Sequence, residues 1–385
     1  MFIIYYSDLN SHDGSNTHIL ELLHNLNKYV DAKLFAPKGK QKVDILNLRY
    51  IPYFKVKYLG SLSYELSLGL HLVYYFSRTK PQIVYLRQNS ISFLPVILCK
   101  IFRIRVIVEI NGLIHDEFFM QSNNKSIFSK IYGYLCLKSE KFNYKNCSKI
   151  ISVTDRLKEE LSKIYGIQSN NIAVINNGAN TDLFKPTDSQ EAKSILNLCP
   201  YKNYVCFVGN LAPWQGVEYI IEASPLILEK EPNTLFLIVG DGTMKQKLLK
   251  LALDLKVADS FIFTGNVAYE TVPIYINASN VCVVPKKPLK SGYSPLKLYE
   301  YMACGKPIIA SNVNGFEILE QINAGLLVNP ENSAELSSAA IKLLSDSHLG
   351  NMMGWQGCDY VGKHHSWNAV AKKVLDVCEN TLEVK

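Results

Sequence analysis

Short apolar runs alternate with amphipathic stretches along the whole chain. Residues 2–6 form an apolar run typical of a buried strand, and after a polar loop at 13–16, residues 17–30 carry apolar side chains at helical spacing. Further strands are expected at residues 32–36, 83–86, 105–110, 149–153 and 172–175. Strands that alternate with helices of about 10–15 residues predict βαβ units and a mostly parallel sheet.

A second series of the same kind follows in the other half of the chain. Its strands are expected at residues 204–208, 235–239, 261–263, 281–284 and 307–310. Between the two series, residues 176–200 are rich in Asn, Gly, Thr, Asp and Pro, which is typical of a linker. We therefore predict an α/β chain of two Rossmann-like domains, 1–185 and 199–365, that face a cleft.

The length and the cysteine pattern agree with this division. A chain of 385 residues is too long for one compact core and suits two α/β domains. The nine cysteines occur singly, without a Cys-x-x-Cys pair, as expected for reduced thiols in the cytosol. Residues 91–108 are hydrophobic but contain Lys100, Arg103 and Arg105, so they cannot provide the roughly 20 apolar residues of a membrane span. We expect a cytoplasmic protein without a signal peptide.

Charge is distributed unevenly along the chain. Residues 1–188 hold 24 Lys and Arg against 15 Asp and Glu, whereas the remainder holds 17 against 19. A basic half indicates an anionic partner, such as a membrane surface or a phosphate-bearing substrate, or else a surface that is basic for solubility. Nucleic acid is the less favoured partner, because no recognised nucleic-acid-binding module accompanies the charge.

The most informative segment is residues 291–307. Ser294 suits the N-cap of a helix and Pro295 its first position, while Gly305 suits the end, so a helix is expected at about 295–304. The unpaired N–H groups and the positive dipole at such a helix start form an anion site suited to a diphosphate.

Two charged residues extend the chemistry of this helix. Lys297 lies in the first turn, where its ammonium reaches the same phosphates, and Glu300 offers a carboxylate that accepts hydrogen bonds from a ribose diol. The alternative is an ordinary surface helix on which Lys297 and Glu300 form an i,i+3 pair.

Glycines follow several of the expected strands. Gly209 and Gly240 come directly after an expected strand and Gly265 comes two residues after one, and such glycines let a ligand approach the backbone closely. Each turn alone is weak evidence, because strand–glycine–helix turns are common in α/β proteins. Neither a complete dinucleotide fingerprint nor a P-loop occurs in the chain.

Taken together, these turns and the segment 291–307 resemble glycosyltransferase family 4, the retaining enzymes of the GT-B architecture. The resemblance also includes residues 152–158 and the linker at 174–186, and it extends from the Gly14 loop to Trp367. It implies that a C-terminal helix at 366–385 crosses back to the N-terminal domain. It also implies that Glu300 is the second glutamate of the family's E-x7-E motif and binds the donor ribose.

By the same resemblance, backbone groups around Gly265 would contact the base, and the backbone N–H groups of Leu296 and Lys297 would contact the β-phosphate. Gly14 would lie near the donor phosphates or the acceptor. The expected donor-binding residues are Gly14, Gly209, Asn210, Gln215, Gly240, Gly242, Gly265, Asn266, Val267, Ser294, Leu296, Lys297 and Glu300.

Three positions depart from the family pattern. The first glutamate of E-x7-E falls at Gly292, and Asn210 and Gln215 stand where the family has an Arg and a Lys that neutralise the leaving diphosphate. Lys297 stands where the family usually has an aliphatic residue, and we expect it to take over that charge. Lys297, Glu300 and Asn111 are the expected catalytic residues.

The N-terminal half offers candidates for acceptor binding. Asn111 stands where the family usually has a His near the transferred sugar, and Glu109, His115 and Asp116 lie beside it in sequence. His18 matches a frequent family His. A structural role for Glu109, and a capping or surface role for His18, are the alternatives.

The resemblance implies a retaining, front-face reaction that needs no dedicated base, and the absence of Asp-x-Asp favours independence from metal. The expected donor is a UDP- or GDP-linked hexose, no cofactor is expected, and the acceptor is a saccharide or a lipid-linked saccharide of surface polysaccharide or glycolipid synthesis. Apolar and basic residues at 55–58 and 118–120 favour peripheral contact with an anionic membrane, with buried packing as the alternative.

A nucleotide-sugar epimerase and a non-catalytic donor-binding subunit are the alternative functions.

Overall fold

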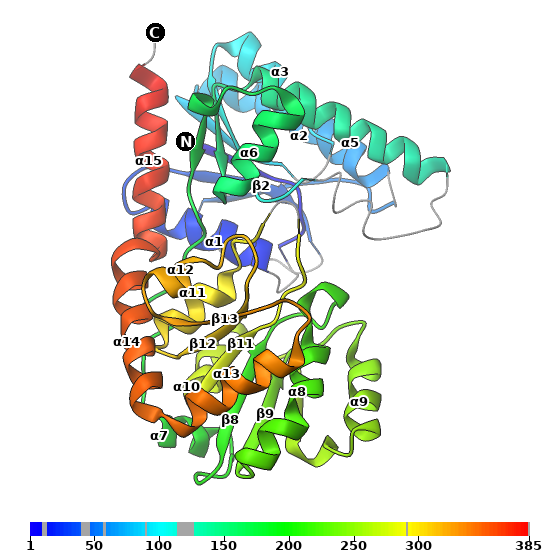
Figure 1. Cartoon of the computed structure of the whole chain (residues 1–385). Helices are drawn as coiled ribbons and strands as arrows, with labels where there is room; N and C mark the ends of the chain where they lie inside the picture. Colours follow the sequence, from blue (N-terminus) through cyan, green and yellow to red (C-terminus); the bar gives the residue numbers. More distant parts are fainter. Residues whose placement is uncertain are drawn as a thin grey trace. The chain divides into compact units, whose positions relative to one another are not determined.

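The computed structural model describes residues 1–9, 14–39, 47–56, 59–88, 91–113, 127–289 and 292–383. The chain divides into two compact units (Figure 1). The first comprises Met1–Asn176 together with Val370–Lys385, and the second comprises Asn177–Ala369. Each unit contains one parallel sheet with helices, so the predicted pair of Rossmann-like domains is confirmed. The predicted domain bounds at 185 and 199 both fall inside the second unit.

The first unit is built on a seven-stranded sheet of order β3-β2-β1-β4-β5-β6-β7, in which all neighbours pair in parallel. Its strands are β1 (Phe2–Tyr5), β2 (Lys33–Pro37), β3 (Leu48–Ile51), β4 (Ile83–Arg87), β5 (Arg105–Ile110), β6 (Lys149–Ser152) and β7 (Ile172–Val174). Its helices include α1 (Gly14–Leu26), α2 (Leu59–Arg78), α3 (Leu94–Phe102), α5 (Ile127–Asn146) and α6 (Asp155–Tyr165). The last helix, α15 (Trp367–Glu383), belongs to this unit from Val370 onward.

Helix α1 begins earlier than its sequence predicts. The expected loop at Gly14–Asn16 is instead its first turn, and the helix ends at Leu26 rather than at Val30. Ser15 and Asn16 are held by hydrogen bonds to a buried side chain, because the Tyr5 hydroxyl lies 2.8 Å from both the Ser15 hydroxyl and the Asn16 side-chain oxygen. A polar helix start held by a buried tyrosine has no apolar periodicity to reveal it.

The second unit has a six-stranded sheet of order β10-β9-β8-β11-β12-β13, again all parallel. Its strands are β8 (Asn203–Val208), β9 (Thr234–Val239), β10 (Phe261–Gly265), β11 (Val281–Val284), β12 (Ile308–Ser311) and β13 (Gly325–Val328). Its helices include α7 (Ser189–Ile195), α8 (Val217–Lys230), α9 (Lys245–Asp254), α10 (Val272–Ala278), α11 (Leu296–Ala303), α12 (Ile318–Gln321), α13 (Ser333–Ser345) and α14 (Ser347–His364). The strand order reverses between β8 and β11, and ligands of open α/β sheets bind at such switch points.

The helix predicted from segment 291–307 is α11, and its end is confirmed whereas its start is not. Gly305 follows the helix with φ +67°, and its N–H donates to the Met302 carbonyl at 2.8 Å, as in a glycine-terminated helix. The N-cap position is Pro295 rather than Ser294. The Ser294 hydroxyl instead accepts a hydrogen bond from the Asn177 N–H at 3.1 Å, which leaves the first turn of α11 without a side-chain cap.

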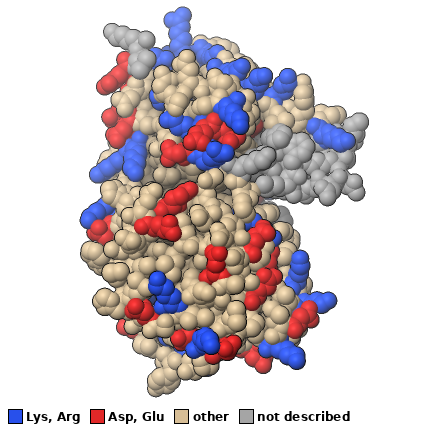
Figure 2. Space-filling view, in the orientation of Figure 1, with Lys and Arg blue, Asp and Glu red and all other residues tan. Residues whose placement is uncertain are grey.

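Two strands, β3 and β13, were not predicted; each is buried only at its two ends, whereas the predicted β11 of equal length is buried throughout. Among the described helices, none is long and apolar enough to cross a bilayer. On the face shown in Figure 2, acidic and basic side chains are visible on both units, with Lys and Arg the more prominent on the first.

Candidate functional site

In the second unit, helix α11 is fixed to the carboxyl end of β8. The N–H of Val208, the last residue of β8, donates to the Tyr301 hydroxyl at 2.7 Å. Lys297 precedes Tyr301 by four residues, so both side chains lie on the same face of α11. The ammonium of Lys297 is thereby directed to the turn that follows β8.

The Lys297 ammonium occupies a closely defined position. Nζ donates a hydrogen bond to Oε1 of Gln215 at 3.0 Å and lies 4.2 Å from the centroid of the Phe207 ring. It also lies against Gly209, where a Cβ atom would be 2.3 Å from Nζ and where φ is +146°. Any side chain at position 209 would therefore both strain the backbone and displace the ammonium.

A second buried ammonium lies near the first. Burial lowers the pKa of Lys286 to about 8, and its Nζ lies 4.7 Å from the centroid of the Tyr293 ring. Burial, followed by the charge of Lys286, lowers the pKa of Lys297 well below its usual range. Among the described residues, no carboxylate lies within 4.0 Å of either ammonium. Two poorly neutralised cations in one place favour the binding of an anion.

Glu300 lies one turn after Lys297 and is also mostly buried. Its Oε1 accepts a hydrogen bond from the Tyr269 hydroxyl at 3.2 Å. Glu300 raises the pKa of Lys297, but the two charged groups form no ion pair within 4.0 Å. The alternative of an exposed i,i+3 pair on a surface helix is therefore wrong.

The glycine turns of the second unit pack backbone against backbone. A Cβ atom on Gly240 would lie 2.1 Å from the Gly209 carbonyl oxygen, and one on Gly242 would lie 2.4 Å from Oδ1 of Asn210. The Gly240 N–H donates to the Gly265 carbonyl at 3.0 Å. The structure thus brings together the turns after β8, β9 and β10, with Asn266 and Val267 directly following.

In the first unit, the predicted acceptor residues gather around one carboxylate. Glu109, near the end of β5, is 2% exposed and forms ion pairs with His18 at 3.1 Å and with Arg87 at 3.4 Å. It also accepts hydrogen bonds from the Tyr85 hydroxyl and from the side-chain amide of Asn111. The cluster follows from strand register, because Arg87 of β4 pairs with Glu109 of β5.

Electrostatics keep this carboxylate ionised. Burial alone would raise the pKa of Glu109, but the charges of His18 and Arg87 hold that pKa below its usual range. Both carboxylate oxygens are engaged by protein groups, which favours the structural interpretation of Glu109 as the residue that positions its neighbours. His18 is buried in the second turn of α1, so neither a capping nor a surface role applies to it.

Sequence reasoning missed four residues of these sites, namely Tyr85, Arg87, Tyr269 and Lys286. Arg87 and Lys286 could have been found, because each charged residue stands at or just beyond the carboxyl end of a buried strand. The two tyrosines gave no such signal. Gly14 lies exposed at the start of α1. The predicted acceptor residues His115 and Asp116 lie outside the described residues.

The chain matches two family profiles that together span most of its length. Residues 12–183 match Glycosyltransferase Family 4, and residues 188–358 match Glycosyl transferases group 1. The chain belongs to this family of glycosyltransferases.

Among curated relatives, an uncharacterized glycosyltransferase of Methanocaldococcus jannaschii is 30% identical over 63% of this chain and 62% of its own length. The alpha-D-kanosaminyltransferase of Streptomyces kanamyceticus is 23% identical over 75% of this chain and 74% of its own. The chain thus spans less than two thirds of the first of these relatives.

Solved structures share the fold over the full chain. Sucrose-phosphate synthase from Thermosynechococcus elongatus superposes with a TM-score of 0.79 at 20% identity, covering 100% of both chains. HepE of Anabaena, in a complex with UDP and glucose, gives a TM-score of 0.76 at 16% identity over 98% of this chain and 99% of that one. Likeness at this identity shows the fold alone.

Glu109→Gln is expected to destabilise the first unit by about 3–5 kcal/mol, because it leaves the buried Arg87 guanidinium without its carboxylate and removes the partner of His18. The measurement is the free energy of unfolding in denaturant at neutral pH. Since the pKa of Glu109 is lowered on folding, its contribution is present above the ordinary carboxyl range near 4.3 and is lost as the pH falls below it.

Glu159→Gln is the matched control, because Glu159 forms an exposed ion pair with Arg156 on α6 and should cost less than about 1 kcal/mol. Equal destabilisation by the two variants would contradict the assigned role of Glu109.

The affinity for a nucleoside diphosphate is expected to fall as the pH rises above about 8. Lys286, whose pKa burial lowers to about 8, loses its proton there and with it the charge that attracts the anion. The decline should approach, at most, about tenfold per pH unit, and titration calorimetry between pH 7 and 9.5 measures it. Lys286→Arg should make the decline shallower, because Arg stays protonated and the remaining titration comes from Lys297, whose pKa is also lowered. Lys250→Arg, on α9, is the control and should leave the pH profile unchanged. An affinity of the unchanged protein that does not vary with pH would refute the prediction.

Proposed function

We propose that the protein transfers a hexose from a UDP- or GDP-sugar to a saccharide or lipid-linked acceptor with retention of configuration. The observation that carries the proposal is the pair of buried ammonium groups, Lys297 and Lys286, beside the glycine turns of the second unit. A donor diphosphate supplies the charge that this pair lacks, and the uncapped first turn of α11 adds unpaired N–H groups.

We assign the ends of the donor to the neighbouring residues. Glu300, held by Tyr269, binds the ribose hydroxyls, and the backbone at Gly265, Asn266 and Val267 contacts the base. The sugar lies where the family's first E-x7-E glutamate is replaced by Gly292, which has φ +69°.

Lys297 replaces the family's missing loop cation by an exchange of positions. In the family the cation stands at position 215 and an aliphatic residue at 297, whereas here an amide stands at 215 and the cation at 297. The hydrogen bond between Lys297 and Gln215 supports this exchange, since the two side chains meet at the same point. Catalysis then consists mainly of stabilising the departing diphosphate, and preorganised charges of this kind contribute about 10²–10³-fold each.

The reaction is proposed to be metal-independent, with the leaving phosphate accepting the proton of the acceptor. Among the described residues, no group of three or more His, Cys, Asp or Glu side chains could hold a metal ion. Metal independence itself stays a prediction, tested by turnover in the presence of a chelator. His18 and Asn111, both positioned by Glu109, are assigned to the acceptor side of the reaction.

Names of relatives support the substrate classes. One relative, 29% identical over 206 residues, is the GDP-mannose-dependent alpha-(1-6)-phosphatidylinositol monomannoside mannosyltransferase of Mycobacterium tuberculosis. Its name combines a nucleotide-sugar donor with a lipid-bearing acceptor. Synthesis of a surface polysaccharide or glycolipid is the process that we propose for this chain.

Lys297→Leu is expected to lower kcat about 10²–10³-fold, because the departing diphosphate loses its cation. The double variant Gln215→Lys/Lys297→Leu restores the family arrangement and should recover most of the loss. Gln215→Lys alone is the control for the new lysine. Near-normal turnover by Lys297→Leu, measured by release of nucleoside diphosphate, would contradict the assignment.

A panel of UDP-, GDP- and ADP-sugars tests the proposed function directly. A matching donor should raise the melting temperature of the protein and be consumed only slowly until an acceptor is added. NMR of the glycoside then shows whether the anomeric configuration is retained. An inverted free sugar formed without acceptor would favour the epimerase, and binding without turnover in the presence of acceptor would favour a non-catalytic subunit.

Peripheral contact with the inner face of the cell membrane is also proposed. It is supported by an exposed apolar stripe along α2, formed by Leu59, Leu62, Leu66, Leu70, Val73 and Tyr74, and by the net positive charge of the first half of the chain. Sedimentation with phosphatidylglycerol vesicles should carry down the protein at low salt and less of it at high salt. Equal sedimentation with neutral vesicles, or none with either, would contradict an electrostatic contact with the membrane.

A further inference from the structure

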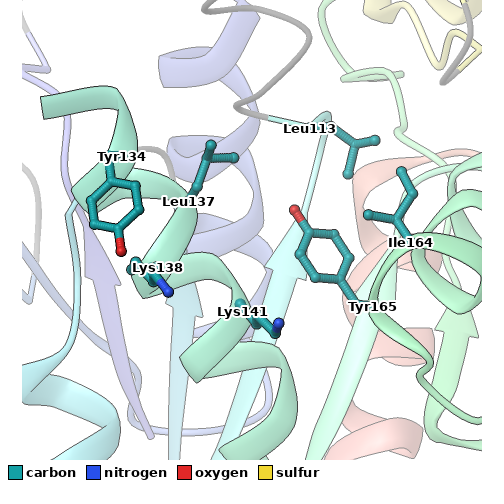
Figure 3. A pocket seen from close by; sticks show the side chains of 7 residues that line it. All are labelled: Leu113, Tyr134, Leu137, Lys138, Lys141, Ile164 and Tyr165. Atoms are coloured by element: carbon teal, nitrogen blue, oxygen red, sulfur yellow. The ribbon is translucent and has the colours of Figure 1, made fainter. Parts of the chain in front are cut away.

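A cavity of about 370 Å³ lies within the first unit, between helices α5 and α6 (Figure 3). Its apolar lining consists of Leu113, Leu137 and Ile164, and its polar lining consists of Lys138, Lys141, Tyr134 and Tyr165. In Figure 3 the three apolar side chains lie along one side, and the ammonium groups of Lys138 and Lys141 lie on the other. The volume is within the range of small-ligand sites.

One wall of this cavity is held in place from behind. The Tyr165 hydroxyl donates to Oε2 of Glu140 at 3.0 Å, and its ring packs edge-on against Tyr144 with centroids 5.1 Å apart. Tyr144 also donates to Glu140, at 3.0 Å, so the buried carboxylate is enclosed by two phenols. Because the Tyr165 proton is directed to Glu140, the charged donors that remain for a ligand come from the lysines, with the Tyr134 hydroxyl as a neutral donor beside them.

The exposed face of α5 is basic. Lys130, Lys138, Lys141 and Lys145 are all exposed on this helix, and its one acidic residue, Glu140, is buried. Lys138 is further oriented by the Tyr134 ring, with Nζ 5.2 Å from the ring centroid. Two of the four lysines thus line a cavity whose remaining wall is apolar.

We propose that this cavity binds an anionic amphiphile, namely a phosphate ester of a hydrocarbon chain. The phosphate lies between Lys138 and Lys141, and the first carbons of the chain lie on Leu113, Leu137 and Ile164. A free phosphate would leave the apolar wall unused, and a neutral chain would leave the two ammonium groups without an anion.

The position of Leu113 connects this cavity with the reaction. Asn111 and Leu113 both lie in the segment that follows β5, and they are two residues apart. Asn111 is assigned to the acceptor side of the reaction. The cavity is therefore placed to hold the lipid phosphate of an acceptor while the saccharide lies toward Asn111. This link rests on the proposed function, whereas binding of the phosphate ester does not.

Dodecyl phosphate below its critical micelle concentration is the probe, and titration calorimetry is the measurement. The unchanged protein should bind it at least tenfold more tightly than it binds dodecyl maltoside or inorganic phosphate. Lys138→Ala/Lys141→Ala should weaken this binding at least tenfold. Lys130→Ala/Lys145→Ala removes the same charge from the same helix outside this cavity and should change the affinity less than twofold.

The apolar wall is tested separately with Ile164→Asn, which should reduce the preference for dodecyl over butyl phosphate at least fivefold. Melting temperatures of all variants establish that each one is folded. Equal weakening by the two double-lysine variants would overturn the proposal, since it would show that only the general charge of α5 matters. An unchanged affinity in Lys138→Ala/Lys141→Ala would overturn it as well.

Monomeric dihexanoyl phosphatidylglycerol distinguishes the two sources of such a ligand. Tighter, lysine-dependent binding of the diacyl lipid assigns the cavity to membrane phospholipid, and tighter binding of dodecyl phosphate assigns it to a single-chain lipid carrier. These measurements need no turnover, so they stand even if the transferase activity fails. Conversely, if the protein transfers sugar to a lipid-linked acceptor but does not bind dodecyl phosphate, the proposed ligand of the cavity is wrong and the proposed function stands.

Discussion

The arrangement of the second unit depends on the contact between the end of β8 and helix α11. The backbone N–H of Val208, the last residue of β8, donates its hydrogen bond to the Tyr301 hydroxyl. This contact sets the rotation of α11, and the rotation determines that Lys297 lies against Gly209 while Glu300 faces Tyr269. The chemistry of the site therefore rests on the packing of one helix at the switch point of the sheet.

Both units bury charged side chains, but in one unit the charges at the site have partners of opposite sign and in the other, among the described residues, they do not. Around Glu109 groups of opposite charge are in contact, since the carboxylate faces Arg87 and His18 and accepts two further hydrogen bonds. Around Lys297 and Lys286 the charges are unmatched, and burial lowers the pKa of both. A balanced cluster stabilises the fold, whereas an unbalanced one is completed by a ligand.

Much of the fold was predictable from the sequence because buried parallel strands are continuous apolar runs. Residues 105–110 and 281–284 were predicted with their observed bounds for this reason. Contacts made by polar side chains were not predictable in the same way. The start of α1 depends on Tyr5, and the use of Ser294 depends on Asn177, which is more than a hundred residues distant.

The residues of the candidate site likewise fall into those that the sequence predicts and those that only the structure shows. Lys297 and Glu300 were predictable because they lie in a glycine-terminated helix with a family pattern. Lys286 carried a weaker signal, since it stands just beyond the carboxyl end of β11, whereas Tyr269 carried none, because its importance arises only where the loop after β10 meets α11. Arg87 stands at the end of β4, which the sequence shows, but its pairing with Glu109 became visible only through strand register.

The meeting of Gln215 and Lys297 bears on how such a site changes during evolution. Two substitutions separate this arrangement from the family's, and they could have occurred in either order. If Lys297 arose first, the intermediate carried two ammonium groups at the diphosphate, which preserves the attraction for the donor. If the loop lysine was lost first, the intermediate carried neither of these two cations. The first route keeps a cation at the meeting point of residues 215 and 297 in every intermediate, whereas the second leaves Lys286 as the cation nearby.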